Sequence, residues 1–352
     1  MTKTITATAP VRTCDCGGWT DTWFARRGAV FHIAVNPGIR VRVRPRPLAA
    51  REAATVALHA ENYGDRYTFV PGTRPWLRHP LLEAAVASEG VPPGLAVDVS
   101  VWSAVPPGAS AGTSAAVCVA LLGALRTLWG RSMDPDGIAA AAHAVEVERL
   151  GQQSGLQDQI AAAHGGINYI EIPGYPNAVR HAVQVSDETR AALQRRLLLV
   201  YLGRTHSSSA IHEEVIREIG GPGSAGRAAL AALREAAADA RDAVAAGDLE
   251  GLGDAMRANT EAQRRLHPSL IGTDAERVIA AAREAGALGW KINGAGGEGG
   301  SMAILCGPEA GSRAAAEAAI VHASSAYQLL STSIAPAGLE VVVNAGNSDE
   351  AA

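Results

Sequence analysis

The sequence predicts an α+β fold, organised as two domains or as one large one. The 352 residues contain no long linker and are ample to bury a core. Segments that alternate apolar and polar residues, typical of half-buried strands, are interleaved with segments of helical period. The chain changes character near Glu188 to Ala192, so we place domains at residues 1–190 and 191–345 and a frayed tail at 346–352.

Composition and charge exclude several classes of protein. Hydrophobic residues make up 47% and charged residues 19%, and the formal net charge is −4, which argues against a disordered chain or a nucleic-acid-binding surface. The N-terminus lacks a basic segment followed by an apolar one, and no apolar run reaches the roughly 18 residues that a membrane helix needs. We therefore expect a cytoplasmic monomer or homodimer with neither nucleic acid nor membrane as partner.

The four cysteines indicate reduced thiols. Cys14, Cys16, Cys118 and Cys306 are spread over the chain without paired C-x-x-C clusters. In a strand, Cys14 and Cys16 would face the same side, which favours packing residues over a metal site. Basic residues are almost all Arg, and the two lysines are Lys3 and Lys291.

Residues 9–46 read as a strand, a tight loop and further strands. Ile39, Val41 and Val43 alternate with arginines, so one face of that strand is expected to be buried. In the loop, Arg12, Thr20 and Asp21 offer a guanidinium and a carboxylate that suit adjacent hydroxyls of a polyol. A surface turn with a salt bridge is the alternative.

A strand, a loop of small residues and a helix follow in that order. After the amphipathic helix HPLLEAAVASEG, the strand GLAVDVSVWSAV runs into PPGASAGTSAA, residues 106–116, and a helix is expected over 113–126. The small residues leave backbone N–H groups free to surround a phosphate at the helix N-terminus. An ordinary flexible loop is the alternative. The loop is not a Walker A motif, because no Gly-Lys-Ser/Thr follows.

Three carboxylates stand out in the next segment. Glu146 and Glu148 lie near the end of a predicted helix, where they oppose its dipole unless a cation such as Mg²⁺ or a basic neighbour compensates. Solvated glutamates beside Arg149 are the alternative. Asp158 lies among small and amide residues, which suits a buried functional carboxylate.

The second half of the chain carries another glycine-rich loop. Ala-rich helices extend over about 210–266, and a helix over 274–286 leads to LGWKINGAGGEGG, which lies between two short strands. A helix at 311–324 and the strand GLEVVVN are expected to close the second domain.

Three separated segments, the GGWTD loop, PPGASAGTSAA and KINGAGGEGG, resemble the motifs of the GHMP small-molecule kinases. GGWTD, GLQDQIAAAHGGIN and GALGWKINGAGG are most similar to the sugar-kinase branch, which includes D-glycero-D-manno-heptose 7-phosphate kinases and galactokinases. The resemblance implies an N-terminal domain with a mixed sheet and helices, a C-terminal antiparallel sheet covered by helices, and an active site in the cleft between them.

The resemblance also implies ATP and Mg²⁺ as cofactors and assigns roles by position. Asp158 would face the acceptor hydroxyl, as a base or as an orienting group, and Arg12 would lie near the transferred phosphate. The expected nucleotide-binding residues are Pro107, Gly108, Ala109, Ser110, Ala111, Gly112, Thr113 and Ser114. The expected metal ligands are Ser114 and Glu146. The expected substrate-binding residues are Gly18, Trp19, Thr20, Asp21, Asp158, His206, Gly296 and Gly297.

The sequence departs from this family at four positions. Trp19 and Trp290 replace smaller residues, and we expect Trp19 to form a wall for a sugar ring and Trp290 to lie in the core. Glu298 interrupts the second glycine run, where it would repel a nucleotide unless it points away. His206 stands where the heptose kinases carry a basic residue for a substrate phosphate, which favours an unphosphorylated sugar.

Together these features predict transfer of a phosphate from ATP to a hydroxyl of a sugar or sugar phosphate, such as a hexose or heptose. The anomeric hydroxyl is the expected acceptor. Two alternatives stay open. One is a kinase of the same fold that acts on a non-sugar alcohol resembling mevalonate or homoserine. The other is a non-catalytic sugar-sensing protein.

Overall fold

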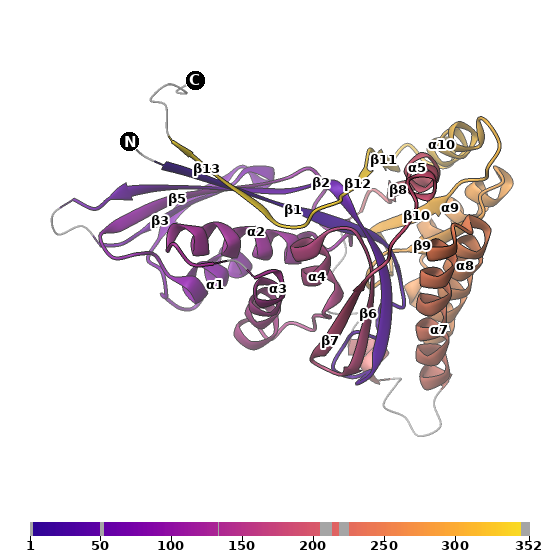
Figure 1. Cartoon of the computed structure of the whole chain (residues 1–352), viewed down its shortest axis with the longest axis horizontal. Helices are drawn as coiled ribbons and strands as arrows, with labels where there is room; N and C mark the ends of the chain where they lie inside the picture. Colours follow the sequence, from indigo (N-terminus) through magenta and orange to yellow (C-terminus); the bar gives the residue numbers. More distant parts are fainter. Residues whose placement is uncertain (1–2, 50–52, 133, 205–212, 218–224, 346–352) are drawn as a thin grey trace.

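The computed structural model describes residues 3–49, 53–132, 134–204, 213–217 and 225–345 and arranges them around two β-sheets. Figure 1 shows the larger sheet with helices packed below it and the smaller sheet beside a pair of long helices. The α+β composition and the two-sheet, two-domain architecture confirm the fold class predicted from the sequence.

The larger sheet is mixed. Its strands are β1 (Lys3–Cys16), β2 (Gly28–Pro47), β3 (Val56–Ala60), β4 (Asp65–Phe69), β5 (Leu95–Ser103), β6 (Ile167–Gly174), β7 (Asn177–Ala182), β12 (Ser333–Ile334) and β13 (Glu340–Ala345). Strands β3 and β5 are parallel, and the other described pairs are antiparallel. The long strand β2 pairs with β1, β5, β6 and β12. As predicted, Ile39, Val41 and Val43 are buried, because alternate side chains of a strand face the same side.

Four helices cover the inner face of this sheet. They are α1 (Pro80–Glu89), α2 (Thr113–Leu128), α3 (Pro135–Ala144) and α4 (Gln157–His164). Helix α2 is central, and its Leu121, Leu122 and Leu125 are fully buried, as expected from their helical spacing. Asp134 is the N-cap of α3, and its side chain accepts hydrogen bonds from two backbone N–H groups of the first turn.

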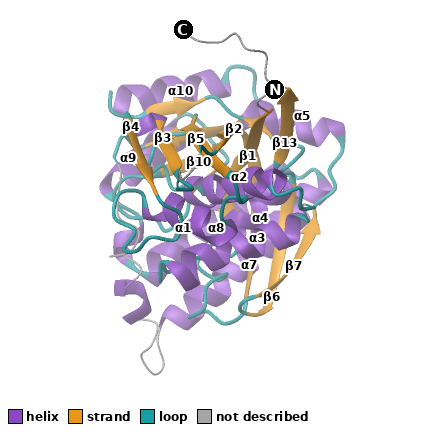
Figure 2. Cartoon of the chain, turned by 90° about the vertical axis from the view of Figure 1, so that its left-hand side faces the viewer, coloured by secondary structure: helices purple, strands orange, loops and turns teal. Residues whose placement is uncertain are grey.

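The smaller sheet is antiparallel, in the order β11-β8-β10-β9. Its strands are β8 (Leu197–Tyr201), β9 (Gly289–Ile292), β10 (Ser301–Leu305) and β11 (Gln328–Leu330). The helices of this half are α5 (Asp187–Arg196), α7 (Ala225–Ala246), α8 (Leu249–Leu266), α9 (Thr273–Glu284) and α10 (Ser312–Ala323). Helices α7 and α8 contact each other along their length and also pack on β1; Figure 2 shows the helices and strands by colour.

The last strand corrects one expectation. GLEVVVN was expected to close the second domain, but β13 pairs with β1 of the larger sheet, with Ile5 opposite Val343. The first and last described strands therefore lie side by side (Figure 1). This pairing satisfies an edge of β1 that would otherwise present unpaired N–H and C=O groups. The predicted domain boundary at 190/191 falls inside α5.

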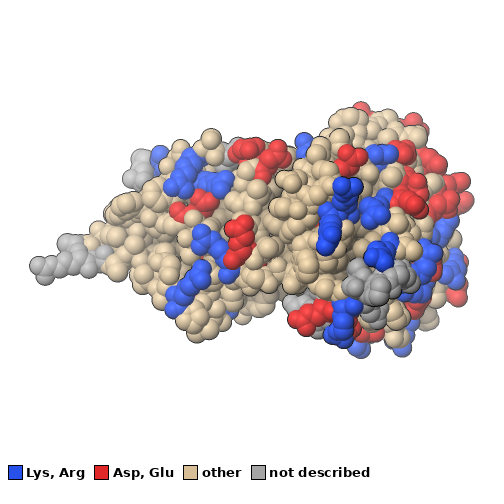
Figure 3. Space-filling view, turned by 90° about the horizontal axis from the view of Figure 1, so that it is seen from below, with Lys and Arg blue, Asp and Glu red and all other residues tan. Residues whose placement is uncertain are grey.

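Charged side chains of both signs lie on the surface, as expected from the small net charge of the sequence. On the face shown in Figure 3, acidic and basic side chains are interspersed. No helix in the described part of the chain is both long and apolar enough to cross a membrane. The four cysteines are free and buried.

Because β13 completes the edge of β1, removal of residues 340–352 is expected to lower the melting temperature by several degrees and to promote aggregation. Removal of residues 346–352 alone leaves β13 in place and serves as the control. Thermal unfolding and light scattering measure both effects. Equal behaviour of the two truncations would contradict this role of β13.

Candidate functional site

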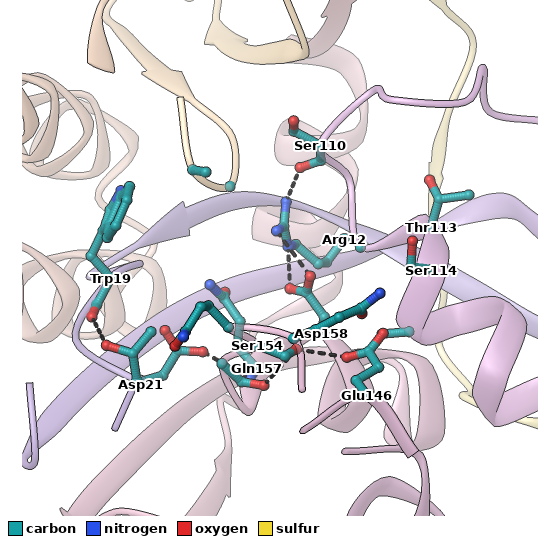
Figure 4. A pocket seen from close by; sticks show the side chains of 18 of the residues that line it. Arg12, Trp19, Asp21, Ser110, Thr113, Ser114, Glu146, Ser154, Gln157 and Asp158 are labelled. Atoms are coloured by element: carbon teal, nitrogen blue, oxygen red, sulfur yellow. Dashed lines mark hydrogen bonds and ion pairs between the residues drawn. The ribbon is translucent and has the colours of Figure 1, made fainter. Parts of the chain in front are cut away.

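A cavity of about 360 Å³ lies where five separate segments of the chain meet. This volume suits a small molecule. It is lined by Arg12, Trp19, Asp21, Thr22, Gly108, Ser110, Gly112, Thr113, Ser114, Ala115, Glu146, Gln152, Gln153, Ser154, Gly155, Gln157, Asp158, Gly294 and Ala295. Figure 4 shows Arg12 of β1, Thr113 and Ser114 at the start of α2, and Gln157 and Asp158 at the start of α4 around this cavity.

Arg12 and Asp158 form the central ion pair of the cavity. Nε of Arg12 donates to Oδ1 of Asp158 at 2.8 Å, and Nη2 donates to Oδ2 at 3.3 Å. Arg12 also donates to the backbone oxygen of Ser110, and its side chain is only 4% exposed, whereas that of Asp158 is 28% exposed. Burial by itself lowers the pKa of Arg12, but Asp15 and Asp158 outweigh it and raise the pKa above its ordinary value. The guanidinium is therefore a fixed cation, and the carboxylate faces the cavity.

The loop before α2 turns tightly and leads directly into the N-terminus of that helix. Gly108, Ser110 and Gly112 have φ values of 74°, 55° and 75°, which turn the chain tightly. Gly112 is the N-cap of α2, and no side chain caps this helix. The hydroxyl of Thr113 is buried and has no hydrogen-bond partner within the described residues. Together with the helix dipole, these donors make this end of the cavity suited to an oxyanion.

Glu146 lies in a widened helical turn that follows α3. Residues Val145–Arg149 form a π-helical turn, a local feature often found at functional sites. Glu146 is 3% exposed, and its Oε2 accepts from Ser154 Oγ at 2.6 Å and from Gln159 Nε2 at 2.5 Å. Burial and the charge of Asp158 raise the pKa of Glu146 to about 7, although both hydrogen bonds act in the opposite direction. By contrast, Glu148 is exposed, so only the first of the two predicted glutamates faces the cavity.

Asp21 fixes the start of α4 although the two are far apart in the sequence. Its Oδ2 accepts from the backbone N–H groups of Leu156 and Gln157 at 2.9 and 3.1 Å, and so caps the helix that presents Asp158. Burial raises the pKa of Asp21 to about 6, and the charge of Asp158 adds to this effect. Gly155 is required for this contact, because a Cβ there would lie 2.1 Å from Asp21 Oδ2.

Trp19 forms part of the cavity wall and is also part of the packed core. It is 4% exposed, has a φ of 83°, and belongs to a buried cluster with Leu230, Leu233 and Leu266 of α7 and α8. Its ring centroid lies 6.1 Å from that of Phe24. Trp19 thus packs against helices of the second domain and also lines the cavity.

Several predicted site residues do not line the cavity. Thr20 is fully buried, and its hydroxyl donates to the backbone oxygens of Gly17 and Ala29, so its role there is to hold the loop. Gly296 and Gly297 pack against Leu270 rather than facing the cavity, where Gly294 and Ala295 lie instead. The residues predicted for the site that are absent from the lining are Pro107, Ala109, Ala111, Gly18, Thr20, Gly296 and Gly297. His206 lies outside the described residues.

The two departures in the second glycine motif have structural roles. Oε1 of Glu298 accepts from the backbone N–H of Thr273 at 3.1 Å, which caps α9. This contact points the carboxylate away from the cavity. Trp290 is 7% exposed and lies in the core of the second domain, as predicted.

Sequence reasoning missed the amide-rich wall of the cavity. Gln152, Gln153 and Ser154 line it from residues 151–155, a segment before α4 that shows no regular secondary structure. Their signal in the sequence was the run GQQSGLQDQ, in which uncharged polar residues surround Asp158.

Gly155→Ala is expected to destabilise the protein by about 1–3 kcal/mol, because the added Cβ must displace the carboxylate that caps α4. Gly174→Ala is the matched control, since nothing lies within 4 Å of its added Cβ. Urea unfolding of both variants measures the difference. If the Gly155→Ala protein were as stable as the Gly174→Ala protein, the capping of α4 by Asp21 would not depend on a glycine at position 155.

Comparisons with known proteins match both halves of the chain. Residues 81–166 match the profile of the GHMP kinases N terminal domain, and residues 240–323 match that of the GHMP kinases C terminal. The chain is 25% identical over 214 residues to a D-glycero-alpha-D-manno-heptose 7-phosphate kinase of Campylobacter jejuni, covering 61% of this chain and 62% of that protein. It is 32% identical over 211 residues to a mevalonate kinase of Methanothermobacter thermautotrophicus, covering 60% of this chain and 64% of that protein.

A solved structure extends the similarity in fold over nearly the whole chain. The galactokinase of Lactococcus lactis, solved in complex with galactose, superposes with a TM-score of 0.73 at 16% identity and covers 96% of this chain and 95% of its own. The curated relatives above are matched over less than two thirds of their length. The chain therefore carries, in this order, regions that match the N-terminal and C-terminal domains of the GHMP kinases.

Proposed function

We propose that this protein transfers the γ-phosphate of ATP to the anomeric hydroxyl of a neutral sugar. The observation that carries the proposal is the Arg12–Asp158 pair, which lies in the same cavity as the uncapped N-terminus of α2. Phosphoryl transfer needs a cradle for phosphates, a cation near the transferred group and a residue that orients the nucleophile. These three parts are supplied by different segments of the chain and meet in one cavity.

The α2 end of the cavity fits the phosphates of ATP. Backbone N–H groups at 112–114 and the unpartnered hydroxyl of Thr113 offer donors for phosphate oxygens. Ser114 and Glu146 offer oxygen donors for Mg²⁺, which takes one or two protein oxygens and completes its octahedron with phosphates and water. No cluster of three acidic, histidine or cysteine side chains forms a metal site within the described residues, in keeping with a metal held partly by a nucleotide. When bound, Mg²⁺ would neutralise phosphate charge and the buried charge of Glu146.

The opposite end of the cavity favours a polyol without charge. Asp21, Gln153 and Gln157 line it, and amide and carboxylate groups suit hydroxyls. Among the described residues that line the cavity, Arg12 alone has a cationic side chain, and it is already bound to Asp158. An acceptor that carries its own carboxylate or phosphate would therefore meet Asp21 and Asp158 with little positive charge to offset the repulsion.

In the proposed reaction, Asp158 binds the acceptor hydroxyl and orients its oxygen toward the transferred phosphate. Asp158 is suited to this role because α4 and its cap at Asp21 fix its backbone, while part of its side chain stays exposed to the cavity. Arg12 would stabilise the negative charge on the transferred group. Burial of the guanidinium strengthens that interaction, since water does not screen it.

A non-sugar alcohol is the second candidate acceptor. The observation that favours it is the 32% identity to the Methanothermobacter mevalonate kinase, which exceeds the 25% identity to the Campylobacter heptose phosphate kinase. The charge of the cavity wall argues for the neutral sugar. The two proposals differ in the charge of the acceptor, so direct assay separates them.

We expect ADP release with free hexoses or heptoses and little with their phosphates, mevalonate or homoserine. Asp158→Asn should lower kcat at least ~100-fold and retain nucleotide affinity, because the carboxylate acts on the acceptor hydroxyl. Asp254→Asn, on an exposed part of α8, is the control. Turnover of mevalonate or homoserine alone would overturn the sugar assignment, and sugar binding without ADP release by the wild type would indicate a sensor.

Glu146→Gln is expected to stabilise the free protein at pH 8 by about 3 kcal/mol and to abolish stabilisation by added Mg²⁺ and nucleotide. The folded-state pKa of Glu146, about 7, lies above its ordinary value of 4.5, so stability is lost as pH rises through 7. Gln keeps acceptor oxygen for Ser154 and Gln159 but carries no charge, and the gain should vanish near pH 4. Exposed Glu148→Gln is the control. Urea unfolding at both pH values tests the prediction, which a pH-independent gain would contradict.

A further inference from the structure

A buried ion pair lies behind Arg12, outside the lining of the cavity. Asp15, near the end of β1, and Lys291, on β9, both have 0% exposed side chains, and Lys291 Nζ lies 3.1 Å from Asp15 Oδ1. Apolar residues of similar volume often stabilise a core as well as a buried ion pair does. Stability alone therefore gives little reason for two charges at this place.

The second oxygen of Asp15 reaches the wall of the cavity. Oδ2 accepts from the backbone N–H of Gly294 at 2.9 Å and lies 3.8 Å from Nη2 of Arg12. Gly294 lines the cavity and packs closely on Ser110 and Arg12. A Cβ at this position would lie 3.0 Å from Ser110 O and 3.3 Å from Arg12 Nη2. One carboxylate thus links Lys291, the second glycine loop and the guanidinium.

The charges around Arg12 explain why a second carboxylate is useful. Arg12 lies between Asp158 and Asp15, at 2.8 and 3.8 Å. If Asp158 binds an acceptor hydroxyl, its hydrogen bonds with the guanidinium weaken. Asp15 is then the anion that keeps Arg12 in place. Burial raises the pKa of Asp15, but Arg12 and Lys291 outweigh it and keep the pKa below its ordinary value, so this carboxylate is charged.

We propose that Asp15, neutralised on its far side by Lys291, is a positioning residue that fixes Arg12 and Gly294 on the cavity wall. This inference rests on the proposed phosphotransferase function, in which Arg12 acts on the transferred phosphate. The pair also connects β1 of the larger sheet to β9 of the smaller one. The position of Arg12 therefore depends on contacts from both domains.

Paired substitutions test this role without leaving one charge buried alone. Asp15→Asn/Lys291→Met removes both charges and keeps an acceptor for Gly294 N–H. Asp15→Leu/Lys291→Met removes that acceptor as well. The control, Arg264→Met/Glu276→Gln, removes an exposed ion pair between α8 and α9. For each protein we measure the melting temperature, and kcat and KM with a free sugar and ATP. The Nε–H resonance of Arg12 is followed by NMR in protein made with isotope-labelled arginine. This resonance is assigned by its loss in the Arg12→Lys variant.

We expect the Asp15→Asn pair to lower kcat at least ~10-fold with KM for ATP little changed and a near-normal melting temperature. The Asp15→Leu pair should also raise KM for ATP, because Gly294 is released. In both, the Arg12 Nε–H should exchange faster with water than in the wild type and the control. Wild-type kcat and exchange in both pairs would overturn the positioning role. A wild-type protein inactive on every acceptor would overturn the proposed function instead, and the Arg12 resonance would still decide whether Asp15 holds the guanidinium.

Discussion

The ion pair between Arg12 and Asp158 is the interaction on which the site depends. It joins residues 146 positions apart, at the middle of β1 and the first turn of α4. The backbone of Arg12 also donates to Ala111 O, and its side chain donates to Ser110 O, so the same residue fixes the loop before α2. Arg12 thereby links β1, the loop before α2 and the start of α4. A planar group with five donors suits this task, since each neighbouring segment presents an oxygen.

The cavity concentrates negative charge at a cost in stability. Asp21 and Glu146 are both buried beside Asp158, and burial raises the pKa of each, to about 6 and about 7. Such shifts mean that ionisation of these two carboxyl groups disfavours folding. A cation bound with a nucleotide, as in the proposed function, would offset this cost. In the proposed function, the same carboxylates would therefore contribute both to cation binding and to the cost of folding.

The sequence predicted the local parts of the site better than the direction of individual side chains. Alternate residues of the loop before α2, the start of α2, Glu146 and Asp158 line the cavity, because helix periodicity and small-residue loops are local signals. Thr20 and Gly296 differ, because their orientation depends on contacts within the folded chain. The Thr20 hydroxyl turns toward backbone oxygens of the neighbouring loop and strand, and Gly296 packs on Leu270. The pairing of β13 with β1 was missed for the same reason, because strand partners distant in sequence leave no periodic signal.

The choice of lysine at position 291 follows from the acceptors available there. The chain uses arginine almost everywhere, and Lys3 and Lys291 are its two lysines. Around the fully buried Lys291, the structure shows two acceptors, Asp15 Oδ1 and the backbone oxygen of Ile292. An arginine would bring five N–H donors into this space and leave several of them buried without partners, whereas an ammonium has three donors on a compact charge. Lysine therefore neutralises the far side of Asp15 at the smaller cost in unsatisfied hydrogen bonds, while arginine occupies position 12, where oxygens surround the guanidinium.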